Sequence, residues 1–334
     1  MGRRRRDTRN NKIYLVSRRC TRRYFLLSPD GAGIVARIFW YWIGYAALLT
    51  GIQICAVNLM SSHFHLVVVD RLGLISNFLH ILDRNLALAI KAYRGWPEEV
   101  FNKSQASCVE LLGTEAVLKE MSYTIGNAST SFAVRYSKDW PGAVTRVEDV
   151  GVREIRAKHM PYWSRRPGRK DPTTGAYLDD EEPWIAKEDD RPEVRCGWPH
   201  AVEFRIEWPE VVLEQMKEEE ARRRLAAGVR YQERKAWRQA KERGYSFSNP
   251  KRIVRQKHTR RARSWETFGS RNPRFSAAGD LEAALAAIER NRKFDRQYDQ
   301  ALELWRSGDR RRAVFPHGTW KMRIVHNARC RPPP

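Results

Sequence analysis

The sequence predicts an α+β fold, a ferredoxin-like split βαβ sandwich in which an antiparallel sheet carries helices on one face. Residues 12–111 read in the order strand, helix, strand, strand, helix, strand, which is the element order of that sandwich. A short turn separates the two middle strands, as in an antiparallel hairpin. With 334 residues, the chain is long enough for this domain and a second unit.

The first three elements come from residues 12–59. Lys12–Cys20 alternates loosely between apolar and polar side chains and predicts the first strand. A turn at residues 29–31 precedes a mostly apolar helix over residues 34–49, which the glycine at position 51 closes. Ile52–Leu59 then predicts the second strand.

Two features bear on the compartment in which the protein works. Residues 38–60 are strongly apolar, like a membrane span, but Arg37 stands at their edge and Gly51, Gln53 and Asn58 interrupt them. A helix followed by a strand explains this stretch with less strain, so we expect no membrane span. The five cysteines are scattered and form no Cys-x-x-Cys pair, which fits a reducing cytoplasm.

The third strand carries two histidines. The short run over residues 63–70 is rich in valine and predicts a buried strand. Residues two apart on a strand share a face, with Cα atoms roughly 7 Å apart. The side chains of His63 and His65 therefore point to one face of the sheet and that of Phe64 to the other. Neutral imidazoles bind divalent ions, and the pair is a plausible half of a metal site. Such pairs also occur by chance on ordinary strands.

The sheet is completed by a helix over residues 74–93, where apolar side chains recur with a period close to 3.6, and by a short strand at residues 106–111. The next helix, Thr114–Phe132, places Tyr123 and Asn127 four residues apart on one face. A tyrosine in this setting is more commonly a core or surface residue than a nucleophile. Gly126 marks either a close approach of the backbone to a ligand or the end of the helix.

The second half of the chain has a different composition. Proline-rich residues 161–200 predict an irregular connector. A strand at residues 202–208, a charged helix at 210–243, an amphipathic helix at 281–305 and strand character within 314–325 follow. We therefore divide the chain into a basic arm (1–11), a catalytic-type domain (12–150), a connector (151–200) and an α-rich basic accessory region (201–334).

The formal charge of +23 and the isoelectric point near 10.2 favour a polyanionic partner, above all nucleic acid. The arginine-rich arm suits phosphate contacts, and Trp265 and Phe268 are candidates for stacking on unpaired bases. The predicted nucleic-acid contacts lie in two basic clusters, Arg18, Arg19, Arg22 and Arg23 after the first strand, and Lys251, Arg252, Arg255, Lys257, Arg260, Arg261 and Arg263 in the second half.

These motifs together resemble a known family. The resemblance covers roughly residues 10–150 and rests on the first strand, the His63-Phe64-His65 triplet after Met60-Ser61-Ser62, and Tyr123 with Asn127. It also includes Arg94-Gly95 leading to Val100-Phe101 and the turn at residues 139–142. In these features the chain is similar to the HUH single-tyrosine transposases, in particular to the IS200-like and REP-associated tyrosine transposases.

The resemblance implies a metal-dependent DNA transposase or nickase that cleaves single-stranded DNA. It places Mg²⁺ or Mn²⁺ on His63 and His65, with Asn127 completing the metal shell. Tyr123 would attack the scissile phosphate and leave a 5′-phosphotyrosine and a free 3′-hydroxyl. Single-stranded or hairpin DNA would be the partner, and the choice between monomer and homodimer stays open.

Two positions depart from the family pattern. Ser62 stands where many relatives carry asparagine before the first histidine, and Asn127 is followed by Ala128 instead of proline. Neither change removes a named catalytic atom, but both leave open an inactive copy. The alternative hypothesis is therefore a catalytically silent protein on the same fold that binds nucleic acid, RNA included.

Overall fold

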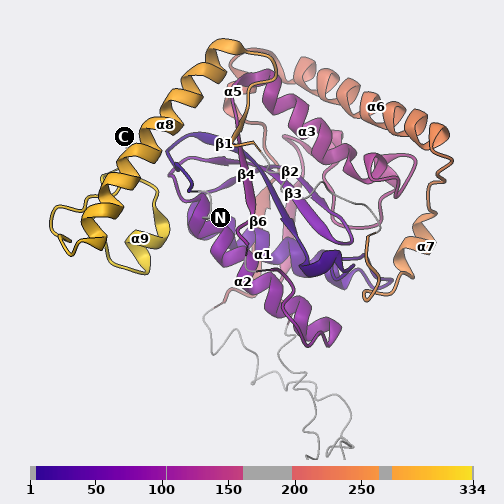
Figure 1. Ribbon diagram of the computed structural model, residues 1–334. Coiled ribbons are helices and arrows are strands. Elements are labelled where there is room, and N and C mark those ends of the chain that lie inside the picture. Colours follow the sequence, from indigo (N-terminus) through magenta and orange to yellow (C-terminus); the bar gives the residue numbers. More distant parts are fainter. Residues whose placement is uncertain (1–4, 103, 161–197, 263–272, 333–334) are drawn as a thin grey trace, which may run out of the picture.

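The computed structural model describes residues 5–102, 104–160, 198–262 and 273–332 (Figure 1). Its centre is a five-stranded sheet in the order β2-β3-β1-β4-β7. The first four strands pair antiparallel, whereas β7 pairs parallel to β4. The strands are β1 (Lys12–Arg19), β2 (Gln53–Leu59), β3 (His63–Asp70), β4 (Ser107–Leu111) and the two-residue β7 (Phe275–Ser276).

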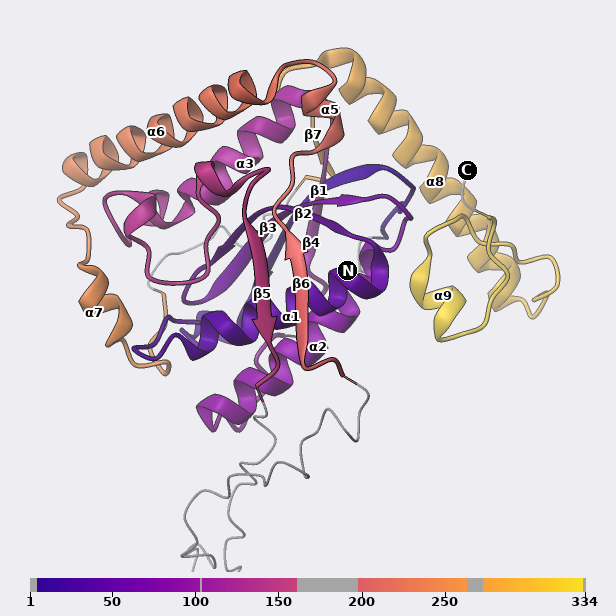
Figure 2. The same cartoon turned by 180° about the vertical axis from the view of Figure 1, so that it is seen from behind.

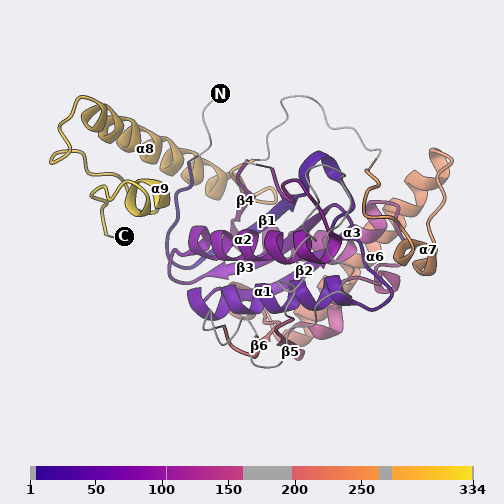
Figure 3. The same ribbon diagram turned by 90° about the horizontal axis from the view of Figure 1, so that it is seen from below.

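Helices α1 (Ile34–Thr50) and α2 (Ile75–Arg94) lie side by side on one face of this sheet (Figure 3). The chain order β1-α1-β2-β3-α2-β4 and the strand order β2-β3-β1-β4 agree with the predicted sandwich. The third helix, α3 (Gly113–Thr130), packs on β2 and β3 from the opposite face. The two helices of the sandwich therefore lie on one face, as predicted, and α3, which follows the sandwich in the chain, covers the His63–His65 side as well.

Side-chain carboxylates start the first two helices. Asp70, at the end of β3, accepts hydrogen bonds of 2.8 Å from the backbone amides of Leu74 and Ile75. Asp30 accepts in the same way from the amides of Ile34 and Val35. These carboxylates satisfy amides that a helix N-terminus leaves without partners.

The apolar stretch at residues 38–60 is divided as predicted. Its first part belongs to α1, and Gly51 ends that helix in the left-handed conformation with φ of 67°. Its second part contains the whole of β2, buried in the sheet. Within the described part of the chain, none of the helices is sufficiently long and apolar to span a membrane.

A second, two-stranded sheet covers the outer side of α1 (Figure 2). Strand β5 (Glu154–Lys158) pairs antiparallel with β6 (Ala201–Arg205). Residues 154–158 belong to the segment predicted as an irregular connector, and they are ordered by this pairing; residues 161–197 lie outside the described ranges. Gly44 of α1 permits the contact, since a Cβ there would stand 2.7 Å from the ring of Phe204.

The predicted helix at residues 210–243 is interrupted after its first turn. The structure has α5 (Glu210–Leu213) and then α6 (Glu218–Glu242), which packs along the outer side of α3. Glycines permit this approach, because a Cβ on Gly126 would stand 3.1 Å from Gln232 and one on Gly228 would collide with Ser122. Gly126 therefore serves helix packing, and α3 continues past it to residue 130.

The C-terminal unit consists of α8 (Leu281–Arg306) and α9 (Trp320–Ile324); the short α7 (Pro250–Val254) comes earlier in the chain. Ion pairs attach α8 to the sheet: Arg290 lies 2.5 Å from Glu110 of β4, and Glu110 lies 3.2 Å from Lys12 of β1. The strand character predicted within 314–325 is wrong apart from a single bridge between Phe315 and Cys330, because residues 320–324 form a helix.

The described part of the basic arm, from residue 5 onward, is attached to the fold. Arg5 forms a 2.7 Å ion pair with Asp299 of α8, and its guanidinium lies 3.9 Å from the centre of the Tyr298 ring. Arg6 donates a hydrogen bond of 2.5 Å to the carbonyl oxygen of Ala106. These arginines therefore have partners within the protein.

Candidate active site

Strand β3 presents both histidines on the face that α3 covers. The ring centres of His63 and His65 are 4.9 Å apart and their planes are nearly perpendicular, at 85°. Phe64 points to the other face, where its ring lies 5.5 Å from that of Phe39 in α1. The alternation predicted from the sequence therefore separates the polar site from the apolar core.

Helix α3 brings the two remaining predicted residues to this pair. The ring centre of Tyr123 lies 5.4 Å from that of His65, edge to face at 76°. One turn later, Oδ1 of Asn127 is 3.3 Å from Nε2 of His63. Tyr123 is half-buried and Asn127 is buried. All four residues that the sequence singled out thus meet between β3 and α3.

Asn58 is a further residue of this site; in the sequence it stands out only because it interrupts an apolar stretch. It is fully buried on β2, directly opposite His65 in the strand register. Its Nδ2 donates a hydrogen bond of 2.9 Å to the carbonyl oxygen of Thr124. A polar residue inside an apolar strand was the available signal, because a buried amide needs hydrogen-bond partners.

The environment of His65 keeps its imidazole neutral. Burial lowers the pKa of His65 well below its ordinary value, and the neighbouring His63 and Arg19 lower it further. Its Nδ1 is buried and has no hydrogen-bond partner. A neutral imidazole with an unpaired nitrogen is chemically suited to bind a metal ion.

Ser62 restricts the orientation of His63. Its Oγ is 3.2 Å from Nδ1 of His63, on the other side of the ring from Asn127. If Nδ1 carries the proton and donates it to Ser62, the Nε2 lone pair faces the same space as the Asn127 oxygen. Such hydrogen bonds from the second ring nitrogen fix the tautomer of metal-binding histidines.

The donor set fits a hard-to-intermediate divalent ion. Across the described ranges, His, Cys, Asp and Glu side chains nowhere gather in threes that could hold a metal. The amide oxygen of Asn127, 3.3 Å from Nε2 of His63, is the group placed to serve as a third ligand at the histidine pair. Two imidazole nitrogens and one amide oxygen suit Mn²⁺ slightly better than Mg²⁺ and leave coordination positions for phosphate and water.

Arg18 is not a surface contact residue. It is buried on the α2 side of the sheet, where it forms a 3.1 Å ion pair with Asp83 and donates to the carbonyl oxygens of Asn102 and Ser104. The predicted DNA contact is therefore wrong for Arg18, because its guanidinium is already satisfied inside the protein. Its neighbour Arg19 is exposed on the histidine side.

The two predicted basic clusters lie together beside the histidine strand, although they are far apart in the sequence. The amides of Cys20 and Leu27 bond to the carbonyl oxygens of Ser62 and Ser61, so residues 20–27 border the turn before His63. Residues 260–262 bond in turn to this loop, with the carbonyl oxygen of Arg260 accepting from Phe25. Exposed members of the second cluster are Lys251, Arg252, Arg255, Lys257, Arg260 and Arg261.

Aromatic rings lie among these cations. The Arg261 guanidinium stands 4.2 Å from the centre of the Tyr24 ring and donates a hydrogen bond to its hydroxyl. The Tyr24 and Trp96 rings meet edge to face at 4.7 Å. Neither ring was predicted from the sequence to contact nucleic acid. The predicted contacts Arg263, Trp265 and Phe268 fall outside the described ranges.

Comparison with known proteins gives structural matches only. No protein-family model matches the sequence, and no curated protein matches it. Among solved structures, the chain is similar to a protein of Deinococcus radiodurans R1 described as a candidate transposase, with 17% identity and a TM-score of 0.27, over 38% of this chain and 97% of that one. It is also similar to a REP-associated tyrosine transposase bound to a REP hairpin. The identity is 15% and the TM-score is 0.37, over 45% of this chain and 85% of that one.

Proposed function

We propose that this protein cleaves single-stranded or hairpin DNA through Tyr123, with Mg²⁺ or Mn²⁺ held by His63, His65 and Asn127. One observation carries the proposal. Two imidazoles on β3, an amide oxygen 3.3 Å from one of them, and a phenol ring 5.4 Å from the other gather on one side of the sheet. A nucleophile beside metal-binding groups is the arrangement that phosphodiester cleavage requires.

The nucleophile in this proposal is Oη of Tyr123. A phenol has a pKa near 10 and is a weak nucleophile at neutral pH, so its proton must leave as the new bond forms. The bond from Oη to phosphorus forms while the bond from phosphorus to the 3′ oxygen breaks. The products are a 5′-phosphotyrosine and a 3′-hydroxyl, which takes up a proton. Because the phosphodiester energy is conserved in the covalent link, the strand can later be rejoined.

The other site residues bind and orient. A bound divalent ion would polarise a phosphate oxygen and offset its developing negative charge. His65 is held neutral by burial, His63 is oriented by Ser62, and Asn127 supplies an oxygen from the same helix face as Tyr123. Asn58 holds the helix turn that follows Tyr123 against the sheet.

The exposed cations beside the site supply the path for DNA. The loop at residues 20–27 and the segment at residues 257–262 form a basic surface that includes Tyr24 and Trp96 and borders the turn before His63. Cations neutralise the phosphate backbone, and aromatic rings stack on unpaired bases. The net charge of +23 agrees with a nucleic-acid partner.

The test is covalent trapping. The protein is incubated with Mn²⁺ and a labelled pool of hairpin oligonucleotides with single-stranded flanks, and the products are separated by denaturing electrophoresis. We expect a protein–DNA adduct that disappears in Tyr123→Phe and His63→Ala. Tyr136→Phe, which removes the hydroxyl of an exposed tyrosine outside the site, is the matched control. Adduct at wild-type levels in both site variants would rule out the assignment, and salt-sensitive binding without any adduct would favour the silent DNA-binding protein.

A further inference from the structure

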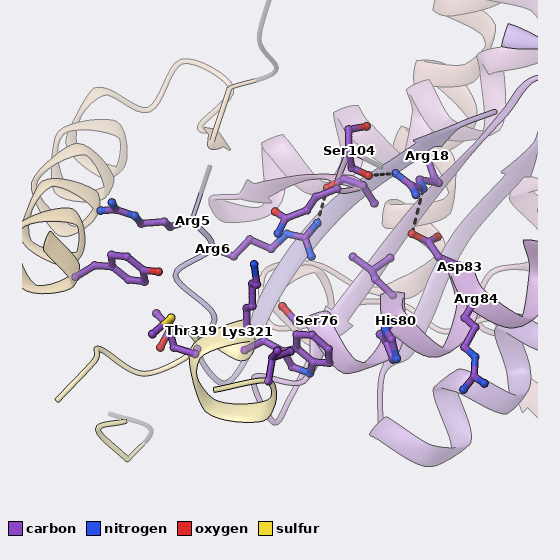
Figure 4. A pocket seen from close by; sticks show the side chains of 18 of the residues that line it. Arg5, Arg6, Arg18, Ser76, His80, Asp83, Arg84, Ser104, Thr319 and Lys321 are labelled. Carbon is purple, nitrogen blue, oxygen red and sulfur yellow. Dashed lines mark hydrogen bonds and ion pairs between the residues drawn. The ribbon is translucent and has the colours of Figure 1, made fainter. Parts of the chain in front are cut away.

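A cavity of about 660 Å³ lies between α2, the basic arm and the C-terminal unit (Figure 4). Its lining includes His80 and Asp83 of α2, Arg6 of the arm, and Trp320 and Lys321 of α9. Sites for small molecules have volumes of roughly 300–1,000 Å³. The cavity is on the α2 side of the sheet, whereas His63 and His65 face α3, so it is separate from the candidate active site.

The charges in this cavity are not balanced within the protein. Five basic side chains and one acid, Asp83, are among its lining residues. Asp83 is paired with Arg18, and Arg5 is paired with Asp299 outside the cavity. Arg6 donates a hydrogen bond to the carbonyl oxygen of Ala106, and neither Arg6 nor Lys321 forms an ion pair among the described residues. Figure 4 shows Lys321 extending from α9 toward Arg6. Two like charges directed into one space favour an anion between them.

Aromatic and hydrogen-bonding groups complete the lining. The rings of His80 and Trp320 lie 5.1 Å apart, tilted by 38°. Nε1 of Trp320 is buried without an acceptor, and Oδ1 of Asp83 is buried without a donor. These two atoms are closed off from solvent, so the groups open to a ligand are the Trp320 ring and the polar side chains of Ser76 and Gln105 in the lining. An aromatic ring beside hydrogen-bonding side chains is the chemistry that recognises a nucleobase.

We propose that this cavity binds a nucleotide, with its phosphate between Arg6 and Lys321 and its base against Trp320. The ligand is either a free nucleotide or the terminal nucleotide of a DNA strand, since both present the same phosphate and base. The arm and α9 each contribute half of the phosphate contacts, so the site exists only when the C-terminal unit is docked. Binding here does not depend on Tyr123.

Calorimetric titration of the full chain with dAMP, deoxyadenosine and inorganic phosphate tests the proposal. We expect dAMP to bind more tightly than either fragment, because only dAMP uses both halves of the site. Lys321→Gln should weaken dAMP binding by roughly tenfold or more, since it removes a charge-assisted hydrogen bond. Arg323→Gln, an exposed arginine of the same helix outside the cavity lining, is the control and should bind dAMP like the wild type.

Two outcomes would overturn the proposal. The first is equal dAMP affinity in Lys321→Gln and Arg323→Gln, and the second is phosphate binding as tight as dAMP binding. Tyr123→Phe should keep full dAMP affinity, which separates this site from the cleavage proposal. In that variant, displacement of dAMP by a 5′-phosphorylated trinucleotide but not by its unphosphorylated form identifies a strand end as the ligand. If neither trinucleotide displaces dAMP, the ligand is the free nucleotide.

Discussion

Nδ2 of Asn58 donates a 2.9 Å hydrogen bond to the carbonyl oxygen of Thr124, the residue after Tyr123. The same amide nitrogen is 3.4 Å from the carbonyl oxygen of Ile125. Because Asn58 is paired with His65 across β2 and β3, one side chain links the tyrosine helix to the histidine strand. The distance between Tyr123 and the histidine pair therefore depends on a residue outside the proposed nucleophile and metal ligands.

Asn58→Asp should lower the yield of covalent adduct at least about tenfold, because a carboxylate oxygen would face the Thr124 carbonyl oxygen and displace α3. The buried Asn85 of α2 offers a matched control, since its amide also donates to a backbone carbonyl, that of Ile81, away from the site. Asn58→Asp and the control Asn85→Asp should each lower the free energy of unfolding by roughly 1–3 kcal/mol. Adduct yields are compared at a temperature where both are folded, and an equal loss in the two variants would contradict a positioning role for Asn58.

Ser62→Ala should weaken Mn²⁺ binding by roughly 10–100-fold, the usual effect of removing a group that orients a metal-binding histidine. Without the Ser62 hydroxyl, His63 loses the 3.2 Å contact at Nδ1 that helps to set the orientation of its ring. Calorimetric titration with Mn²⁺ measures the effect. Ser61→Ala, one residue earlier in the same turn, should bind the ion normally; if the two variants behave alike, Ser62 does not orient the histidine.

The half-buried Asp83 should give the protein a distinct pH dependence of stability. Burial raises the pKa of Asp83 from 3.8 to about 6, although Arg18 and Arg6 oppose the shift. The folded state then holds this proton more tightly than the unfolded state, so the contribution of Asp83 to stability falls as pH rises from about 4 to about 6. The change is on the order of 2–3 kcal/mol.

Urea unfolding of wild type and Asp83→Asn at pH 4.5 and 7.5 measures this effect. The difference between their free energies of unfolding cancels the contributions of the carboxyl groups that both proteins share. The free energy of unfolding of the wild type minus that of Asp83→Asn should be lower at pH 7.5 than at pH 4.5. A difference that stays constant between the two pH values would show that the carboxyl titrates normally.

Gly228→Ala should destabilise the protein by roughly 1–3 kcal/mol, as expected for overpacking, because the new Cβ would collide with Ser122 where α6 crosses α3. Adding Ser122→Gly removes the side chain in its path. The double variant should therefore be more stable than the sum of the two single effects predicts. Thermal and urea unfolding of the four proteins gives this coupling, and strict additivity would mean that the helices do not approach closely here.

Arg261→Gln should weaken binding of single-stranded DNA and reduce the slope of log affinity against log salt by about 1, the effect of losing one phosphate contact. Its guanidinium is exposed above the Tyr24 ring, next to the loop that borders His63. Fluorescence anisotropy at several salt concentrations measures both quantities. Arg312→Gln, an exposed arginine of the C-terminal unit, removes the same charge and should leave the slope unchanged.

The sequence alone determined the elements of the central domain and singled out His63, His65, Tyr123 and Asn127, but it did not identify Asn58. Local signals, such as loose alternation in β1, a valine-rich run in β3 and the 3.6-residue period of α2, predicted the segments that form β1 to β4 and α1 to α3. The two-residue spacing on a strand predicted that His63 and His65 share a face, and the four-residue spacing on a helix predicted the same for Tyr123 and Asn127. The helix and strand that divide residues 38–60 followed from the same patterns together with Gly51.

Tertiary structure alone decided which element covers which face and which cations stay exposed. The position of α3 on the histidine side, the pairing of β5 with β6 and the two-residue β7 all depend on contacts between distant segments. Arg18 and Arg19 look equivalent in the sequence, yet Arg18 is buried in an ion pair with Asp83 whereas Arg19 is exposed. Local patterns show which side of a strand turns inward, but the free energy of burying a charge or an amide depends on the partner that the fold brings to it.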